Sequence, residues 1–197
     1  SCANIANEGI FRRNYSKIVG RQPTRTDGGD DRPTRRSAMG CKIVGHGKAQ
    51  PELVVSNDDL ANIVDTSDEW IRERTGMTER HVISNEKLED LAAEAARKAI
   101  EDAGITPEDI DYIICSNVVN EYITPGLSCI IQGAIGAKCA CVDVNAACSG
   151  FIYALDMADD RIKSGKAKTI LVVAAEEPTR MVCLLYTSPS PRDMRRS

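Results

Sequence analysis

Three short runs rich in Val and Ile constrain the fold of this 197-residue chain more than any other feature. They cover Asp111 to Cys115, Cys141 to Val144 and Thr169 to Ala175, and each run is apolar enough to be buried on both faces. Amphipathic helical patterns from Leu127 to Ile135 and from Phe151 to Ser164 separate the runs. The order β-α-β-α-β predicts an α/β fold with a mostly parallel sheet covered by helices.

More helices are expected upstream of these strands. Ser56 with Asp59 resembles a capping box ahead of a short helix, and Thr66 is expected to restart a helix that stops at Gly76. The apolar stripe from Leu88 to Ala103 predicts a longer helix, which the following glycine ends. A domain of about 150 residues buries about 70% of its unfolded surface, so one folded core is expected.

The two ends of the chain differ in composition from the core, residues 39–181. Residues 1–38 hold eight basic and four acidic residues without helix or strand periodicity, so we expect a disordered leader. This leader is either translated upstream sequence, with Met39 as the true start, or an arginine-rich transit peptide. Residues 182–197 contain a Pro-Ser-Pro-Arg-Asp run that resembles translated sequencing adapter, although an ordinary polar loop has a similar composition.

The charge and cysteine content exclude several classes of function. Residues 39–181 hold 14 basic and 24 acidic residues, a charge of 14 − 24 = −10, so no electrostatic footprint for nucleic acid is present. The apolar runs fall far short of the roughly 20 residues that a membrane span needs. The eight cysteines are dispersed and the two histidines lie far apart, so no metal site is expected, and reduced thiols indicate a cytoplasmic setting.

Cys148 is the sharpest candidate for chemistry. A β-branched run ends at Val144, small residues follow, and a helical pattern begins at Phe151, which places the thiol at a helix N-terminus. Unpaired backbone N–H groups and the positive end of the helix dipole favour the thiolate there, and the same groups can hold an oxyanion. The alternative is that Cys148 is a small buried hydrophobe, as most free cysteines are.

Two separated motifs decide between these interpretations. Asn145-Ala-Ala-Cys-Ser-Gly-Phe151, after a buried strand, resembles the nucleophile turn of the β-ketoacyl-acyl carrier protein synthase III family of the thiolase superfamily. Val64-Asp-Thr-Ser-Asp-Glu-Trp-Ile-Arg-Glu-Arg-Thr-Gly76 and Glu79-Arg80-His81 resemble an upstream part of the same family. The resemblance covers residues 39–181 and implies a thiolase-like layered α-β-α-β-α fold, of which only the N-terminal half is present.

The resemblance also implies roles for individual residues. Cys148 matches the nucleophile, Trp70 the residue that stacks on the adenine of coenzyme A, and Thr66 and Arg74 neighbours that contact the same molecule. On general grounds Trp70 is instead a core anchor, Thr66 a helix N-cap and Arg74 part of a solvated face. Thr124 matches a position where some members carry a bulky aromatic that limits the acyl tunnel of the neighbouring subunit, and the hypothesis is that the smaller threonine could admit longer or branched primers.

The implied activity is that of an acyltransferase that initiates type II fatty acid synthesis. It uses acyl-CoA and malonyl-acyl carrier protein as substrates, without a permanently bound cofactor, in a homodimer. The histidine and asparagine for condensation lie in the missing half, so His46 and His81 are expected to be structural and the chain inactive in condensation. The alternatives are a polyketide, quinolone or hydroxymethylglutaryl-CoA type synthase, or an inactive assembly partner; a genuine transit peptide would indicate the plastid.

Overall fold

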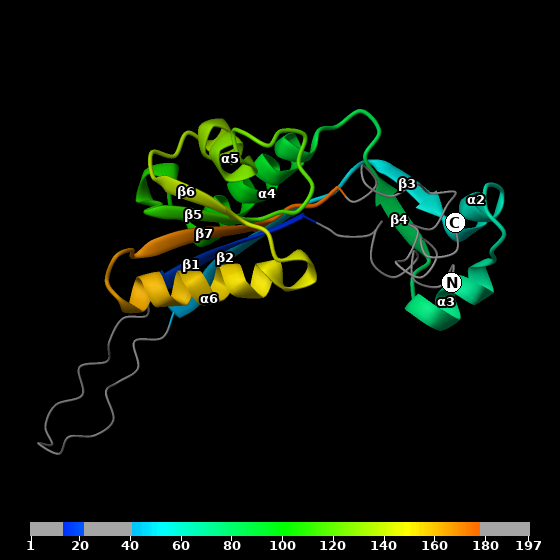
Figure 1. Ribbon diagram of the computed structural model, residues 1–197, viewed down its shortest axis with the longest axis horizontal. Helices are drawn as coiled ribbons and strands as arrows, with labels where there is room; N and C mark the ends of the chain where they lie inside the picture. Colours follow the sequence, from blue (N-terminus) through cyan, green and yellow to red (C-terminus); the bar gives the residue numbers. More distant parts are fainter. Residues whose placement is uncertain (1–13, 22–40, 178–197) are drawn as a thin grey trace, which may run out of the picture.

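The computed structural model describes residues 14–21 and 41–177, and a five-stranded sheet is the centre of this part (Figure 1). The strand order is β2-β1-β7-β5-β6. Strands β5, β6 and β7 run parallel, whereas β1 is antiparallel to both of its neighbours. The prediction of an α/β fold is therefore confirmed, and the expected parallel pairing holds for β5, β6 and β7, but β1 makes the sheet as a whole mixed. The strands are β1 (Asn14–Arg21), β2 (Cys41–Ala49), β5 (Tyr112–Ser116), β6 (Ala140–Val144) and β7 (Thr169–Ala174).

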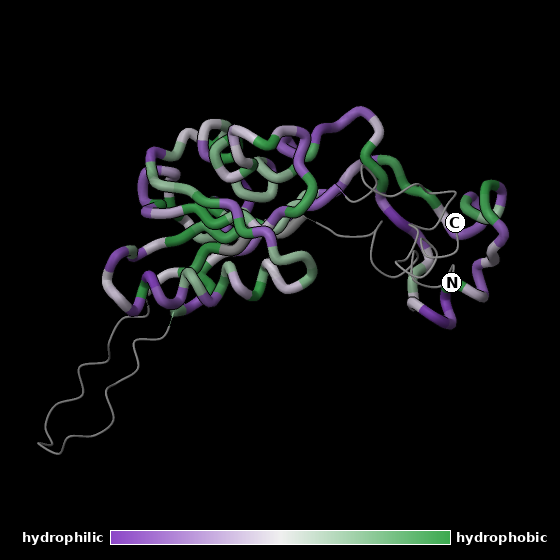
Figure 2. Tube along the Cα trace, viewed as in Figure 1, coloured by the Kyte–Doolittle hydropathy of each residue, from purple (hydrophilic) through white to green (hydrophobic). Residues whose placement is uncertain are grey.

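Helices cover both faces of this sheet, which gives three layers (Figure 1). α4 (Leu88–Ala103) and α5 (Leu127–Ile135) lie on one face, and α6 (Gly150–Lys163) lies on the other. Because side chains alternate along a strand, Ile113 of β5 packs under α4 and α5 while Ile114 packs against α6. Figure 2 shows the resulting concentration of hydrophobic residues along the strands.

Glycines let α4 approach β2 closely. A Cβ added at Gly45 would lie 2.5 Å from the carbonyl oxygen of Ala99, and one added at Gly47 would lie 2.2 Å from that of Ala95. Both alanines are fully buried on α4. Small residues on both elements therefore bring the helix backbone almost into contact with the strand backbone, which is one reason for glycine in a strand.

Strand β1 corrects the expectation of disorder for residues 1–38, which is wrong for Asn14–Arg21. Ile18 and Val19 are buried on opposite faces of the sheet, because β1 lies between β2 and β7. The sequence Lys-Ile-Val-Gly occurs in β1 at residues 17–20 and again in β2 at residues 42–45. The folded part thus includes residues ahead of Met39, while residues 1–13, 22–40 and 178–197 lie outside the described residues, as does the predicted tail.

A smaller unit lies beyond one end of the main sheet (Figure 1). It consists of the antiparallel pair β3 (Leu53–Ser56) and β4 (Glu79–Val82) with helices α2 (Asn57–Ala61) and α3 (Asp68–Thr75). Ser56 and Asp59 form the predicted capping box at α2. Thr66 does not cap α3, because the side chain of Ser67 accepts the amide of Trp70 instead.

A buried polar contact joins the helices of this unit to β4. Asn57 is almost fully buried and donates to Asp68 Oδ1 at 2.7 Å and to the Met77 carbonyl oxygen at 2.8 Å. Its own Oδ1 accepts from the buried guanidinium of Arg80, which also donates to the Ser56 carbonyl oxygen at 2.8 Å. Because buried polar groups are costly unless they are hydrogen-bonded, these contacts fix α2, α3 and β4 relative to one another.

Candidate active site

Cys148 lies in a tight turn between strand β6 and helix α6. A short 3-10 turn, Ala147–Ser149, follows the strand, and α6 begins at Gly150. Ala147 has φ of +45°, a left-handed conformation that costs an L-residue about 1 kcal/mol or more. This strand, strained turn and helix is the arrangement that presents a nucleophile at the end of a sheet. The predicted position of Cys148 at a helix N-terminus is confirmed.

The turn leaves the thiol accessible. Ser149 N donates to the Ala146 carbonyl oxygen at 3.1 Å and Gly150 N donates to the Ala147 carbonyl oxygen, so the amide of Cys148 takes part in neither bond. Cys148 is exposed, whereas Cys115 on β5 is fully buried. The alternative that Cys148 is a buried hydrophobe is therefore wrong, and its role as a nucleophile stays a prediction.

The carboxyl ends of the three parallel strands meet around this turn. Ser116, the last residue of β5, is buried directly behind Gly150, where an added Cβ would lie 2.3 Å from its Oγ. Asn117, the next residue, is also buried, and the sequence analysis assigned it no role. Its backbone N–H donates to the Val144 carbonyl oxygen at 3.2 Å, and its side-chain Nδ2 donates to the Ala175 carbonyl oxygen at 2.7 Å. Asn117 therefore ties β6 and β7 together at the edge that carries Cys148.

Glu176 organises the loop that follows β5. Its carboxylate accepts the amides of Val118 at 2.8 Å and Val119 at 3.3 Å. The loop continues to Thr124, the predicted tunnel position, which is exposed beside the fully exposed Ile123. Sequence reasoning missed Asn117 and Glu176, because their contacts join residues 57 or 58 positions apart and no local pattern indicates them.

The predicted coenzyme A residues lie on or next to helix α3. Arg74 is exposed, and its guanidinium carbon lies 4.4 Å from the centroid of the Trp70 ring. Arg74 also donates to the Trp70 carbonyl oxygen at 3.4 Å. Trp70 and Thr66 are partly exposed, so the expectation of a core anchor at Trp70 is wrong. The start of α6, yellow in Figure 1, is the end of that helix nearer to this smaller unit.

The two histidines form contacts that suit a structural role. His81 Nδ1 lies 2.6 Å from the Pro51 carbonyl oxygen and Nε2 lies 2.7 Å from Gln50 Nε2, so the neutral ring donates at one end and accepts at the other. His46 Nδ1 lies 2.7 Å from Asp102 Oδ2, between β2 and the end of α4. Residues 14–21 and 41–177 hold no cluster of three potential metal ligands, and none of the helices there could cross a membrane.

Comparison with known proteins now identifies the family. The model of the family described as "Thiolase, N-terminal domain" matches residues 71–192, which is more than half of the chain. The chain belongs to the thiolase family. The match reaches beyond residue 181, and whether residues 182–197 are foreign stays a prediction.

The chain is similar to proteins of known sequence that are named β-ketoacyl-[acyl-carrier-protein] synthase III. It is 50% identical to that of Xanthomonas campestris pv. campestris over 143 residues, which are 72% of this chain and 44% of that protein. The relative from Aquifex aeolicus is 46% identical over 156 residues, 75% of this chain and 50% of that protein. The predicted resemblance is confirmed, and the chain spans about half the length of these relatives.

Solved structures agree with the thiolase-like fold. The crystal structure of 3-oxoacyl-[acyl-carrier-protein] synthase III from Aquifex aeolicus has a TM-score of 0.72 at 44% identity and covers 74% of this chain and 47% of that one. The priming β-ketosynthase of the R1128 polyketide pathway has a TM-score of 0.68 at 31% identity and covers 92% and 46%. The layered α/β fold, present as its N-terminal half, is thus confirmed.

Proposed function

We propose that this chain is the N-terminal half of a β-ketoacyl-acyl carrier protein synthase III that starts type II fatty acid synthesis, and that Cys148 is its nucleophile. The observation that carries the proposal is the exposed thiol in a strained turn, where parallel strands end and α6 begins. Relatives of about 50% identity bear the name of this enzyme. The proposed activity is therefore acyl transfer through a cysteine.

The first step needs a thiolate, an acyl-CoA and donors for an oxyanion. The Cys148 thiolate attacks the thioester carbonyl, and the tetrahedral oxyanion collapses with loss of the coenzyme A thiolate, which leaves an acyl-cysteine thioester. The Cys148 amide, which is not used in the turn's hydrogen bonds, is a candidate donor for that oxyanion. The residues in front of this backbone amide, 145–147, are small: two are alanines, and Asn145 carries one short amide side chain.

Trp70, Arg74 and Thr66 are the proposed contacts for coenzyme A. Trp70 presents an indole that is partly exposed, and Arg74 provides a guanidinium beside it that suits a phosphate. Coenzyme A enters as part of the substrate and no permanently bound cofactor is required.

Transfer of label from acetyl-CoA tests the nucleophile. We expect the 197-residue chain incubated with radiolabelled acetyl-CoA to incorporate label weakly, because the rest of the synthase is absent. The Cys148→Ala variant should lose the label. Cys129→Ala is the matched control, because Cys129 is also exposed but lies within helix α5, and this variant should keep the label. Equal labelling of both variants would contradict the proposal.

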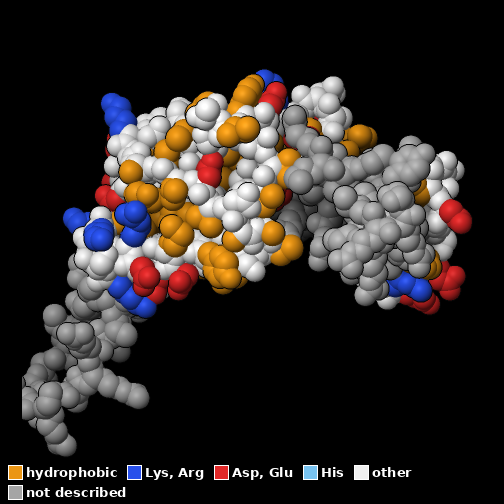
Figure 3. All heavy atoms as spheres, viewed as in Figure 1, with side chains coloured by type: hydrophobic (Ala, Val, Ile, Leu, Met, Phe, Trp, Pro, Cys, Tyr) orange, Lys and Arg blue, Asp and Glu red, His pale blue; other side chains and the backbone are white. Residues whose placement is uncertain are grey.

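The second step belongs to the complete synthase. Condensation with malonyl-acyl carrier protein needs a histidine and an asparagine that the family carries in its second half, so this chain alone is expected to be inactive in it. The outward side of α6 exposes Ile152, Tyr153 and Met157, and Figure 3 shows hydrophobic side chains over the first part of that helix. Such a face supports a larger protein in which the second half covers it. We also propose a cytoplasmic homodimer, or a plastid one if the leader is a transit peptide.

A related synthase of secondary metabolism is the second candidate. The likeness to the priming β-ketosynthase of the R1128 polyketide pathway, at 31% identity, favours it. Thr124 is exposed at the proposed tunnel position, where a small side chain would admit a longer or branched primer. Primer chain-length profiling of a full-length version tests this, and strict preference for acetyl-CoA would contradict the role of Thr124. A complete gene without the downstream His or Asn would instead indicate an inactive assembly partner.

A further inference from the structure

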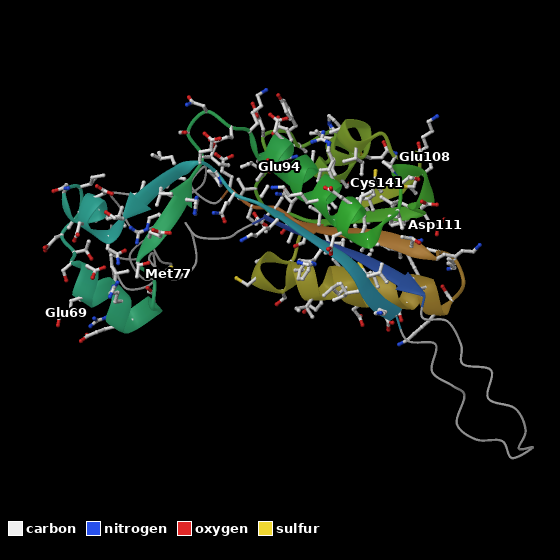
Figure 4. The ribbon with its side chains drawn as sticks, turned by 180° about the vertical axis from the view of Figure 1, so that it is seen from behind. Glu69, Met77, Glu94, Glu108, Asp111 and Cys141 are labelled. Atoms are coloured by element: carbon white, nitrogen blue, oxygen red, sulfur yellow. The ribbon has the colours of Figure 1, made fainter. Side chains whose placement is uncertain are left out.

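Two cysteines outside the proposed active site lie with their sulfurs next to each other. Cys129 is on helix α5 and Cys141 is on strand β6, and their Sγ atoms are 3.4 Å apart. The thiol of Cys141 donates toward the sulfur of Cys129, and both cysteines are free. Figure 4 labels Cys141 on the side of the sheet that α4 and α5 cover. A disulfide requires a separation of about 2.05 Å, so the two sulfurs need a small further approach.

The elements that carry these cysteines are held together on both sides of the pair. Two residues after Cys141, Asp143 accepts the amides of Leu127 and Ser128 at 2.8 Å each, which fixes the start of α5 on β6. Further along α5, the side chain of Gln132 donates to the Cys139 carbonyl oxygen at 2.7 Å. Because both contacts flank the sulfurs, the proximity of Cys129 and Cys141 follows from the way α5 docks on β6.

We propose that Cys129 and Cys141 form a reversible redox site. A peroxide is the oxidant, and the two thiols are converted to an intramolecular disulfide. Hydrogen peroxide first converts the Cys129 thiol to a sulfenic acid and releases one water. The Cys141 sulfur then attacks the Cys129 sulfur, the S–S bond forms, and the sulfenic oxygen leaves as a second water. Two thiol sulfurs are each oxidised by one electron, and the peroxide is reduced to water.

The surroundings set the order of these steps. Cys129 is exposed and can be reached by the oxidant. Burial and the neighbouring Cys129 raise the pKa of the Cys141 thiol to about 11, so Cys141 is a poor first reactant. Burial also raises the pKa of the Cys139 thiol and raises that of the fully buried Cys115 well above its usual range. Cys129 is therefore the entry point, and Cys141 the partner already in contact with it.

The disulfide would change the contact between α5 and β6 from noncovalent to covalent. The loop before α5 carries Thr124, and β6 leads directly to the turn of Cys148. Oxidation would thus restrain the two elements that flank the proposed acyl site. The inference itself does not depend on that proposed function, because it rests on two sulfurs and their packing, and its readout is a covalent bond rather than activity.

Peptide mapping of the full 197-residue chain tests the proposal. After mild hydrogen peroxide, unreacted thiols are blocked and the chain is digested with trypsin, which separates residues 99–138 from residues 139–161 because Lys138 and Arg161 are cleavage sites. We expect these two peptides to be joined through Cys129 and Cys141, to lose two hydrogens on joining, and to separate with dithiothreitol. Fragmentation spectra assign the joined residues.

Two variants make the result decisive. Cys141→Ser should abolish the joined peptides, whereas the matched control Cys139→Ser, two residues away on the same chain segment, should retain them. Loss of the joined peptides in Cys139→Ser but not in Cys141→Ser would overturn the proposal. It would also be overturned if peroxide oxidised Cys148 or Cys129 to acids without joining the two peptides. Far-ultraviolet circular dichroism of each variant verifies that it is folded.

Discussion

Replacing Ile18 by alanine tests whether residues ahead of Met39 belong to the sheet. Ile18 is 0% exposed in the core between the sheet and helices α4 and α5. Truncation of a fully buried isoleucine costs about 2–5 kcal/mol, through lost burial and the cavity left behind. With about 3 kcal/mol, the unfolding equilibrium constant rises by roughly a hundredfold, since about 1.4 kcal/mol corresponds to a factor of ten.

Ile43 is the matched control, because it lies in the same four-residue sequence, Lys-Ile-Val-Gly, on the neighbouring strand β2. Its side chain is 46% exposed, so the same truncation removes much less buried surface and should cost about 1 kcal/mol. Both free energies of unfolding can be measured by urea denaturation followed by circular dichroism. Equal costs for the two variants, within about 0.5 kcal/mol, would refute the central position of β1.

Two further predictions concern carboxylates that accept backbone amides. Asp143→Asn should lower the free energy of unfolding by about 1 kcal/mol in urea denaturation. The two carboxylate oxygens of Asp143 each accept one backbone N–H, from Leu127 and from Ser128, whereas the side chain of asparagine has only one oxygen that can accept. An unchanged urea midpoint would contradict this. Hydrogen bonds from Glu52 N and from residues 84–85 lower the pKa of Glu86 from 4.5 to about 2. The folded-state pKa is thus below the unfolded one, so this stabilisation is complete above about pH 4.5 and is lost toward pH 2. The difference in urea midpoint between the wild type and Glu86→Gln should therefore shrink from pH 5 to pH 2, and a constant difference would count against it.

Most of the sheet could be predicted because its strands carry their own signal. Strands β5, β6 and β7 are Val- and Ile-rich runs, and helices α4 and α5 begin and end where their apolar stripes and glycines indicate. Strand β1 lacks such a signal, since Ile18 and Val19 are a single apolar pair among polar neighbours. Its burial comes from neighbours on both sides in the sheet, which only the tertiary structure supplies.

The candidate site was predictable to the extent that its geometry is local. The turn around Cys148 follows from small residues between a strand and a helix, whereas the cap of α3 was assigned to Thr66 although Ser67 fills it. Both residues can cap a helix, and a shift of one position is not resolved by sequence pattern. The roles of Asn117 and Glu176 could not be predicted from the sequence, because both residues act through contacts between segments that are far apart in the chain.

The position of each cysteine relative to the end of its strand accounts for the different chemistry proposed for it. Cys115 lies inside β5, where both faces are covered and burial raises the pKa of its thiol well above the usual range. Cys141 lies on β6 at the edge of the sheet, partly covered, and its sulfur lies 3.4 Å from that of Cys129. Cys148 lies four residues after Val144, the last residue of the same strand, in a turn where Ala147 adopts a left-handed conformation, and Cys148 is exposed. The partly covered Cys141 and the exposed Cys148 lie seven residues apart on one chain segment, so the accessibility of the Cys148 thiol depends on its place in the strained turn and not on residue type alone.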